Sequence, residues 1–334
     1  MKFNVETMKT RLSPLLLAVL TSAAMAQAPG TKGVAIQPLE AYDVSQLPDD
    51  HYGRLARYGK ELTDRTFAHI GPQAKNPAMR YAGNNLACSS CHQASATKPF
   101  AMPWVGVHSS FPQYRAREDE VSTVEERING CMERSMAGKP LPLDSQEMKA
   151  FMTYIHFLSK GVPTGAKVEG QGLPPFKAPD RRADTVAGGK VYAAKCAVCH
   201  GTEGQGLRTG APADGYTFPP LWGADSFNNG AGMSRLLFAS AFIKTNMPLG
   251  SQHGQPQLSD DEAYDVAAFM LSHPRPQKAN LDRDFPARWN KPVDAAFPPY
   301  VDGAPADQHK YGPFAPLQDN MKKLKDSLLK ASGR

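Results

Sequence analysis

The sequence of 334 residues predicts a mainly α-helical protein with two similar domains and long loops. Three observations lead to this fold class. Apolar residues recur at helical spacing in several stretches. The pattern Cys-x-x-Cys-His occurs twice, at Cys88–His92 and Cys196–His200. Between the two copies, residues 161–183 are so rich in glycine and proline that they are predicted to be a linker.

Residues 1–26 are predicted to be a secretory signal peptide. A positively charged start precedes the apolar run Leu15–Leu20, and Ala24–Ala26 matches a small-x-small cleavage site. A membrane anchor is the alternative, but the run is much shorter than the ~20 residues that span a bilayer. With Gln27 as the first mature residue and no other apolar run of that length, we expect a soluble periplasmic protein without a membrane span.

The first domain is assigned to residues 27–160. After an irregular arm, apolar residues fall at helical spacing from Tyr52 to a Gly-Pro pair that ends the helix. A loop rich in proline and aromatic residues follows the first motif, and Thr123 with Glu126 forms the pattern of a capping box. An apolar stripe near the end of the domain, which contains two methionines, is expected to pack in the core. The predicted helices are residues 52–70, 123–136 and 143–158.

The second domain is assigned to residues 184–273 and repeats the same plan. A short helix precedes the second motif, a long loop follows it, and Leu258–Leu271 is predicted as the closing helix. Residues 274–334 are assigned to a C-terminal strap and basic tail. The strap, residues 274–316, is rich in proline and aromatic residues, and Lys322–Lys325 belongs to a short exposed helix.

The spacing of Cys-x-x-Cys-His suits the covalent attachment of a c-type haem. Two thiols three residues apart can each add to one vinyl group, and the adjacent histidine is then placed below the iron. A redox dithiol would need a βαβ context, which the sequence lacks. We therefore predict two class I cytochrome c-like domains and two covalently bound haem c groups. The cofactor-binding residues are Cys88, Cys91, His92, Cys196, Cys199 and His200.

Each iron needs a distal ligand as well as its histidine. In the second domain, the Met247-Pro248 pair, which lies 47 residues after His200, is similar to the distal loop of class I cytochromes c. We predict that His200 and Met247 ligate the second iron, a pairing that raises its reduction potential. Met233 is the main alternative, whereas Met270, inside a predicted helix, is expected to be core.

The fifth cysteine, Cys131, lies 39 residues after His92, a comparable position in the first domain. On a helix, Arg127, Cys131 and Ser135 share one face, with Arg134 close to it. A cation there lowers the pKa of a thiol, and a thiolate ligand lowers the potential of a haem. The alternatives are a buried inert thiol, an intermolecular disulfide, or a different distal ligand. The competing methionines are Met102, Met132 and Met136.

The positive charge does not indicate a nucleic-acid partner. The formal net charge is +6, and removing residues 1–26 leaves +4. Two haems add about four propionate carboxylates, which roughly cancel this charge.

Several segments resemble the family of dihaem thiosulfate dehydrogenases. The segment around Cys131 is the most specific of them, because haem motifs are shared by very many cytochromes. Together the similar segments cover most of the mature chain. They are Phe111–Glu118, Glu126–Met136, Phe218–Gly223, the Met247-Pro248 pair and Gln308–Phe314.

The resemblance implies that His92 and Cys131 ligate an active-site haem, at which two thiosulfates are reversibly joined into tetrathionate. Electrons would pass to the second haem and then to a small soluble or membrane-attached cytochrome c. Arg117, Arg127 and Ser135 match the family's substrate pocket. Some members carry a lysine directly before the distal methionine, for ligand exchange. Here that residue is Asn246, and Lys244 lies further back.

Three other functions remain open from the sequence. A dihaem electron carrier would need neither Cys131 nor the arginine face. A sulfur-oxidation subunit that also ligates haem by cysteine would require a partner subunit. A dihaem peroxidase is a third alternative, although no calcium-site pattern supports it.

Overall fold

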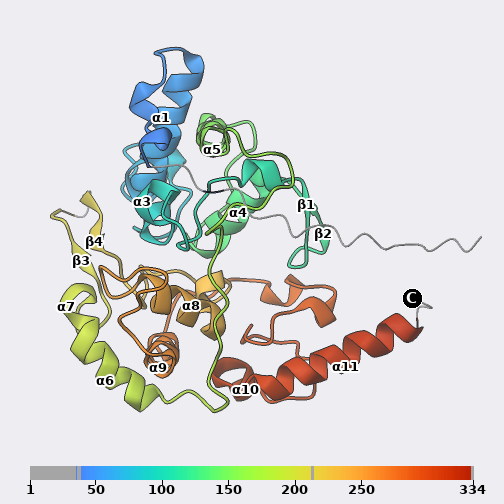
Figure 1. Cartoon of the computed structure of the whole chain (residues 1–334). Helices are drawn as coiled ribbons and strands as arrows, with labels where there is room; N and C mark the ends of the chain where they lie inside the picture. The colour runs from blue at the N-terminus through green and yellow to red at the C-terminus, as the bar shows by residue number, and fades with distance from the viewer. Residues whose placement is uncertain (1–34, 36–38, 212–213, 332–334) are drawn as a thin grey trace, which may run out of the picture. The chain divides into compact units, whose positions relative to one another are not determined.

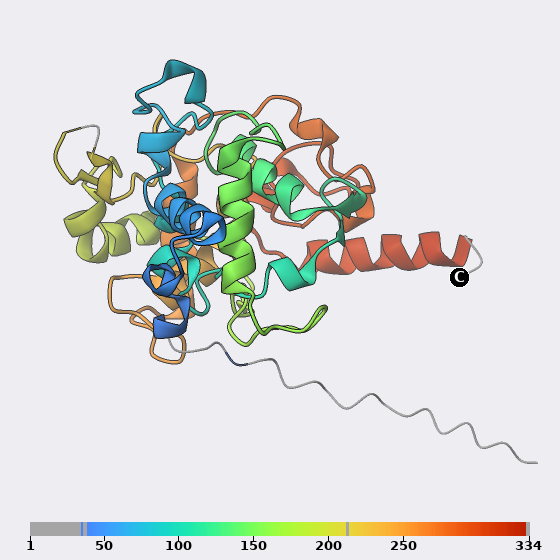
Figure 2. The same ribbon diagram turned by 90° about the horizontal axis from the view of Figure 1, so that it is seen from above.

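The first half of the chain is built on two helices that cross at a glycine. In the computed structural model, which describes residue 35 and residues 39–211 and 214–331, α1 (His51–Asp64) lies beside α5 (Gln146–Leu158) (Figure 2). A Cβ atom at Gly59 would lie only 2.1 Å from the Ala150 carbonyl oxygen. A side chain there would push the helices apart, so the crossing depends on glycine.

The segments between α1 and α5 carry the first haem motif and Cys131. The motif begins in η4 and ends at His92, and Cys131 lies on α4. The hairpin β1–β2 precedes α4, with Tyr114 opposite Val121. The elements are α2 (Thr66–His69), η4 (Cys88–Ser90), α3 (Gln93–Ala96), β1 (Gln113–Arg115), β2 (Glu120–Ser122) and α4 (Val124–Arg134); short 3-10 turns are η1 (Leu39–Tyr42), η2 (Val44–Gln46), η3 (Pro77–Met79) and η5 (His108–Ser110).

The second half repeats this arrangement (Figure 1). Its helices α6 (Thr185–Lys195) and α9 (Asp260–Ser272) also cross at a glycine, because a Cβ atom at Gly188 would lie 2.0 Å from the Asp265 carbonyl oxygen. The repeated crossing agrees with the predicted repeat of one structural plan in the two halves of the chain. The elements between are α7 (Ala197–His200), the hairpin β3 (Leu207–Arg208) and β4 (Tyr216–Phe218), η7 (Gly232–Ser234) and α8 (Leu236–Asn246).

The C-terminal strap contacts both halves. Phe285 N–H donates to the Arg117 carbonyl in the first half, and Asp294 accepts from Arg235 in the second. The strap contains η8 (Leu281–Arg283), η9 (Arg288–Asn290) and α10 (Ala306–Tyr311). The predicted exposed tail helix is α11 (Ala315–Ala331), of which Leu317 is buried.

Two helices begin where their opening residues predict, whereas α5 begins at Gln146, three residues after the predicted Leu143. Thr123 and Glu126 form a capping box at α4, and Ser259 and Glu262 form another at α9. The predicted helix over residues 52–70 is divided in two, because Arg65 has a non-helical backbone (φ −135°, ψ 41°). Helix α8 and both hairpins were not predicted. None of the helices in the described part of the chain is long and apolar enough to cross a bilayer, and the predicted signal peptide lies outside that part.

Candidate functional site: two haem centres and a thiolate

His92 is held in the orientation that an axial ligand requires. Its Nδ1 atom lies 2.6 Å from the Met102 carbonyl oxygen. Because a carbonyl can only accept, Nδ1 carries the proton and Nε2 is left with a free lone pair for iron. The predicted competitor Met102 therefore lies on the proximal side, where its carbonyl positions His92.

Cys131 lies in contact with a cation on the same face of α4. Nη1 of Arg127, one turn earlier, donates to the Cys131 sulfur at 2.9 Å. Burial alone would raise the pKa of Cys131, but the positive charge of Arg127 above all, together with the nearby His92, lowers it to about 6. The lowered pKa favours the thiolate, the form that binds iron. Since His92 contributes to this lowered pKa, the two predicted ligands of the first iron lie near each other.

The thiols of the first motif differ sharply from Cys131. Burial, above all, raises the pKa of Cys88 to about 12 and that of Cys91 to about 11. The hydroxyl of Thr66 accepts from Cys88 N–H at 3.1 Å and fixes the start of the motif. The raised pKa values keep Cys88 and Cys91 neutral, as in the thioether bonds of a c-type haem. The lowered pKa of Cys131 favours its anionic form.

The second motif is also built around an oriented histidine. His200 Nδ1 lies 2.8 Å from the Pro219 carbonyl oxygen, which again leaves Nε2 for iron. A cavity of about 360 Å³ lies against this motif and extends to Cys91 of the first; both Met247 and Met233 line it. An apolar cavity with two cysteines and a free imidazole nitrogen at its wall fits a covalently attached haem.

Lys244 is engaged away from the predicted distal ligand. Its ammonium group donates to the Leu258 carbonyl at 2.7 Å and pairs with Asp260 at 3.0 Å. Asn246, directly before Met247, donates to the Phe100 carbonyl at 3.0 Å. To reach the iron, Lys244 would have to give up two contacts.

The other predicted site residues lie in different surroundings. Arg117 donates to Asp284 at 2.6 Å and to the Gly230 carbonyl at 3.1 Å. Ser135 ends α4, and its N–H donates to the Cys131 carbonyl. Met132 and Met136, the competing ligands, are buried in the core of the first half. The structure thus brings Arg127 into contact with Cys131, near His92, whereas the guanidinium group of Arg117 is bound by Asp284 of the strap.

Sequence reasoning missed Asp284, which binds both Arg117 and Arg134. A single acidic residue in a proline-rich segment belongs to no motif or period. The one clue to Asp284 is indirect. Arg117 and Arg134, once buried, require an acidic partner.

Comparisons with known proteins agree with this geometry. A family model described as SoxA/TsdA, cytochrome c domain, matches residues 79–164, and one described as cytochrome c matches residues 185–274. Thiosulfate dehydrogenase from Stutzerimonas stutzeri is 40% identical over 75% of this chain and 77% of its own length. That from Allochromatium vinosum is 43% identical over 69% of this chain and 82% of its own.

A solved structure is also similar. Thiosulfate dehydrogenase (TsdBA) from Marichromatium purpuratum, in its "as isolated" form, aligns with a TM-score of 0.64 and 34% identity. The match covers 71% of this chain and 49% of that one, so the chain corresponds to about half of the solved protein. Together with the two oriented histidines, these relatives show two cytochrome c domains that each hold one haem c. This chain belongs to the thiosulfate dehydrogenase family.

Proposed function

We propose that this protein is a periplasmic thiosulfate dehydrogenase that joins two thiosulfate dianions into one tetrathionate dianion and releases two electrons. The observation that carries the proposal is the contact of Arg127 with Cys131, at 2.9 Å, near His92. A plain electron carrier has no need for an activated thiol at a haem.

The chain's own residues address the main difficulty of this reaction, which brings two anions together. Arg127 provides positive charge beside Cys131 and can donate charge-assisted hydrogen bonds to thiosulfate. Arg117 and Ser135 are proposed as further pocket residues on the strength of the family resemblance. Each bound haem would accept one electron, so the two haems together could take the two electrons that the reaction releases. His200 with Met247 is the proposed exit, toward a small cytochrome c.

The periplasmic location is supported by the signal-peptide pattern of residues 1–26. It is also the compartment in which a c-type haem protein would meet soluble sulfur anions. Fractionation of cells that express the full chain tests this part of the proposal.

A reduction assay on purified holoprotein tests the activity. Thiosulfate should reduce the haems, and tetrathionate should accumulate when a chemical oxidant is supplied. Cys131→Met should abolish turnover while it leaves the spectrum of the second haem intact, because methionine can still reach the iron but offers no thiolate. A Cys131→Met protein that forms tetrathionate at the wild-type rate would exclude the thiol from the chemistry and favour an electron carrier. Turnover by the single chain would exclude a subunit that needs a partner.

A further inference from the structure

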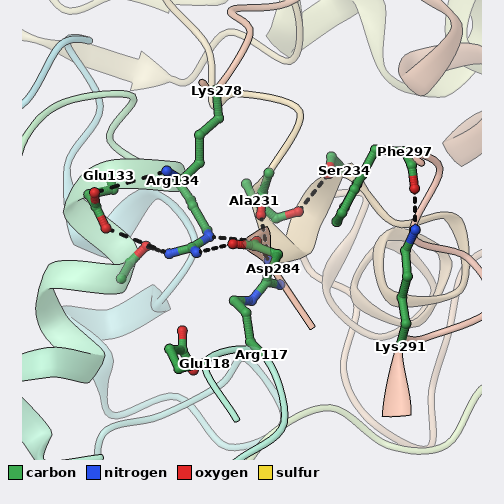
Figure 3. A network of polar contacts seen from close by, with 12 residues as sticks. Arg117, Glu118, Glu133, Arg134, Ala231, Ser234, Lys278, Asp284, Lys291 and Phe297 are labelled. Carbon is green, nitrogen blue, oxygen red and sulfur yellow. Dashed lines mark hydrogen bonds and ion pairs between the residues drawn. The ribbon is translucent and has the colours of Figure 1, made fainter. Parts of the chain in front are cut away.

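Asp284 of the strap is a buried carboxylate with two arginine partners (Figure 3). Its side chain is 7% exposed. Arg134 binds it with two nitrogens, Nη2 to Oδ1 at 2.6 Å and Nε to Oδ2 at 3.2 Å. Arg117 donates to Oδ2 at 2.6 Å. Such charge-assisted, bidentate contacts fix geometry more strictly than a single hydrogen bond does.

The two arginines come from segments on either side of the reactive thiol. Arg134 lies on α4, one turn after Cys131, and Arg117 lies in the turn between β1 and β2. Because α4 is one rigid element, fixing its last residue limits where Cys131 can lie relative to His92. The second half holds the same end of the helix, since Asn228 donates to the carbonyls of Glu133 (2.8 Å) and Arg134 (3.1 Å).

The backbone of the strap is fastened at the same point. Phe285 N–H donates to the Arg117 carbonyl at 2.7 Å, and the Phe285 ring lies 4.9 Å from the Arg117 guanidinium carbon. Phe285 has a left-handed backbone (φ +58°), which a bulky residue rarely adopts without support. The strap therefore presents Asp284 in one defined place.

We propose that Asp284 is a positioning residue for the first haem centre: by holding Arg117 and Arg134 on one carboxylate, it sets the place of Cys131 opposite His92 and orients Arg117. The expected effect on thiosulfate kinetics rests on the proposed function. The expected effect on the haem spectrum depends only on how Cys131 reaches the iron.

The strap offers a matched control. Asp294 is also fully buried and accepts from Arg235 Nε at 2.8 Å, and from Leu237 N–H at 3.0 Å. Both partners lie at the start of α8, in the second half. Asp284→Asn and Asp294→Asn thus remove the same charge from the same strap, but only Asp284 is bonded to a residue of α4.

The experiment compares the two variants as holoproteins by the ferric low-spin EPR signal of the thiolate-ligated haem, thermal unfolding and thiosulfate kinetics. Asp284→Asn should shift or split the thiolate signal and lower kcat/KM by about tenfold to a hundredfold, the cost of a small misplacement. KM should rise, because Arg117 is no longer oriented. Asp294→Asn should leave that signal unchanged.

Two results would overturn the inference: an Asp284→Asn protein with the wild-type haem signal and kinetics, or an Asp294→Asn protein with the same altered haem signal. If Asp284→Asn does not accumulate, Arg134→Lys, which keeps the charge but loses the bidentate contact, carries the same expectation for the haem signal. A wild-type protein without thiosulfate turnover would refute the proposed function, while the EPR comparison would still decide the role of Asp284.

Discussion

Cys131 and Arg127 show how one turn of helix changes the chemistry of a thiol. The sequence places them four residues apart, and the capping box at Thr123 makes the helix between them predictable. Their place on one face of the helix could therefore be predicted from spacing, but the contact of the two side chains could not, because an arginine on a helix more often points into solvent. The orientation of His92 could not, because its partner is a backbone carbonyl of Met102 in a loop without periodicity.

Arg127→Ala should affect thiosulfate turnover more than haem attachment. The variant loses a charge-assisted contact of about 1.5–3 kcal/mol, which corresponds to roughly a tenfold to hundredfold fall in kcat/KM. Steady-state kinetics with a chemical oxidant measure this. Arg127→Lys, which keeps the charge, should lose less. Arg54, an exposed arginine of α1 that pairs with Asp49, supplies the control Arg54→Ala, with wild-type kinetics expected. Equal kinetics in all three variants would make Arg127 an ordinary helix residue.

Met247 should be the distal ligand of the second haem in both redox states. The ferric wild-type protein should show the near-infrared band of methionine bound to iron, and Met247→Gly should lose it. Met233 lines the same cavity, so Met233→Leu is the matched control and should keep the band. A band that survives Met247→Gly but not Met233→Leu would reassign the ligand. A wild-type spectrum of lysine ligation would mean that Lys244 leaves Leu258 and Asp260.

The crossing helices are the part of the fold that composition and period could only partly predict. Apolar spacing located α1 and α5, although α5 begins at Gln146 and not at Leu143, and the run Ser259–Glu262 located the start of α9. The closeness of the crossings depends on two glycines inside the helices, where glycine lowers helix propensity and gives no periodic signal. Helix α8 was missed because seven of its residues are buried, including polar Ser240, Thr245 and Asn246, which obscures an amphipathic pattern.

Gly188→Ala should destabilise the second half, whereas Gly189→Ala should not. An alanine Cβ at position 188 would lie 2.0 Å from the Asp265 carbonyl oxygen of α9, and backbone cannot move aside cheaply. We expect a loss of about 1–3 kcal/mol from overpacking. At position 189 the nearest atom belongs to the Phe269 ring, at 3.2 Å, which can rotate away. There, alanine favours the helix over glycine by about 0.5–1 kcal/mol, which offsets the cost of the close contact with the Phe269 ring. Thermal unfolding of both holoproteins measures the difference, and equal unfolding temperatures would contradict the close crossing.

The two halves are joined by polar contacts that link residues far apart in the chain. Asn84 donates to the Ser135 and Ser226 carbonyls, and Asn85 N–H donates to Asp225 at 2.8 Å. A repeat in the sequence predicts two domains but not the contacts between them. Each hydrogen-bonded pair of residues depends on the relative orientation of the two halves, which the repeat does not specify. The motifs of the candidate site were therefore readable from the sequence, while Asp284, which we propose positions them, was not.

The mature protein should carry two covalently bound haems. Mass spectrometry of protein exported to the periplasm should give the mass of residues 27–334 plus two haems, which tests the cleavage site and both motifs together. The double variant Cys196→Ala/Cys199→Ala should be one haem lighter. Haem that acidified organic solvent extracts from the wild-type protein would contradict covalent attachment.

Acid should weaken the contact between the strap and the first half through Asp284. Burial alone would raise the pKa of Asp284, but hydrogen bonds and charge from Arg134, and then Arg117, hold it below its ordinary value of 3.8. A carboxyl whose pKa is lower in the folded state stabilises the protein above its unfolded pKa, and this contribution is lost as the pH falls through the folded pKa.

Wild-type protein should therefore be more stable than Asp284→Asn at neutral pH, by about 3 kcal/mol, because the variant leaves two buried guanidinium groups without a partner charge. The difference should stay constant down to about pH 5 and shrink below about pH 4, as Asp284 takes up a proton first in the unfolded chain and, at lower pH, in the folded protein. Chemical unfolding across this range, followed by far-ultraviolet circular dichroism, gives both curves. A stability difference that is the same at pH 3 as at pH 7 would show that the charge of Asp284 does not hold the strap in place.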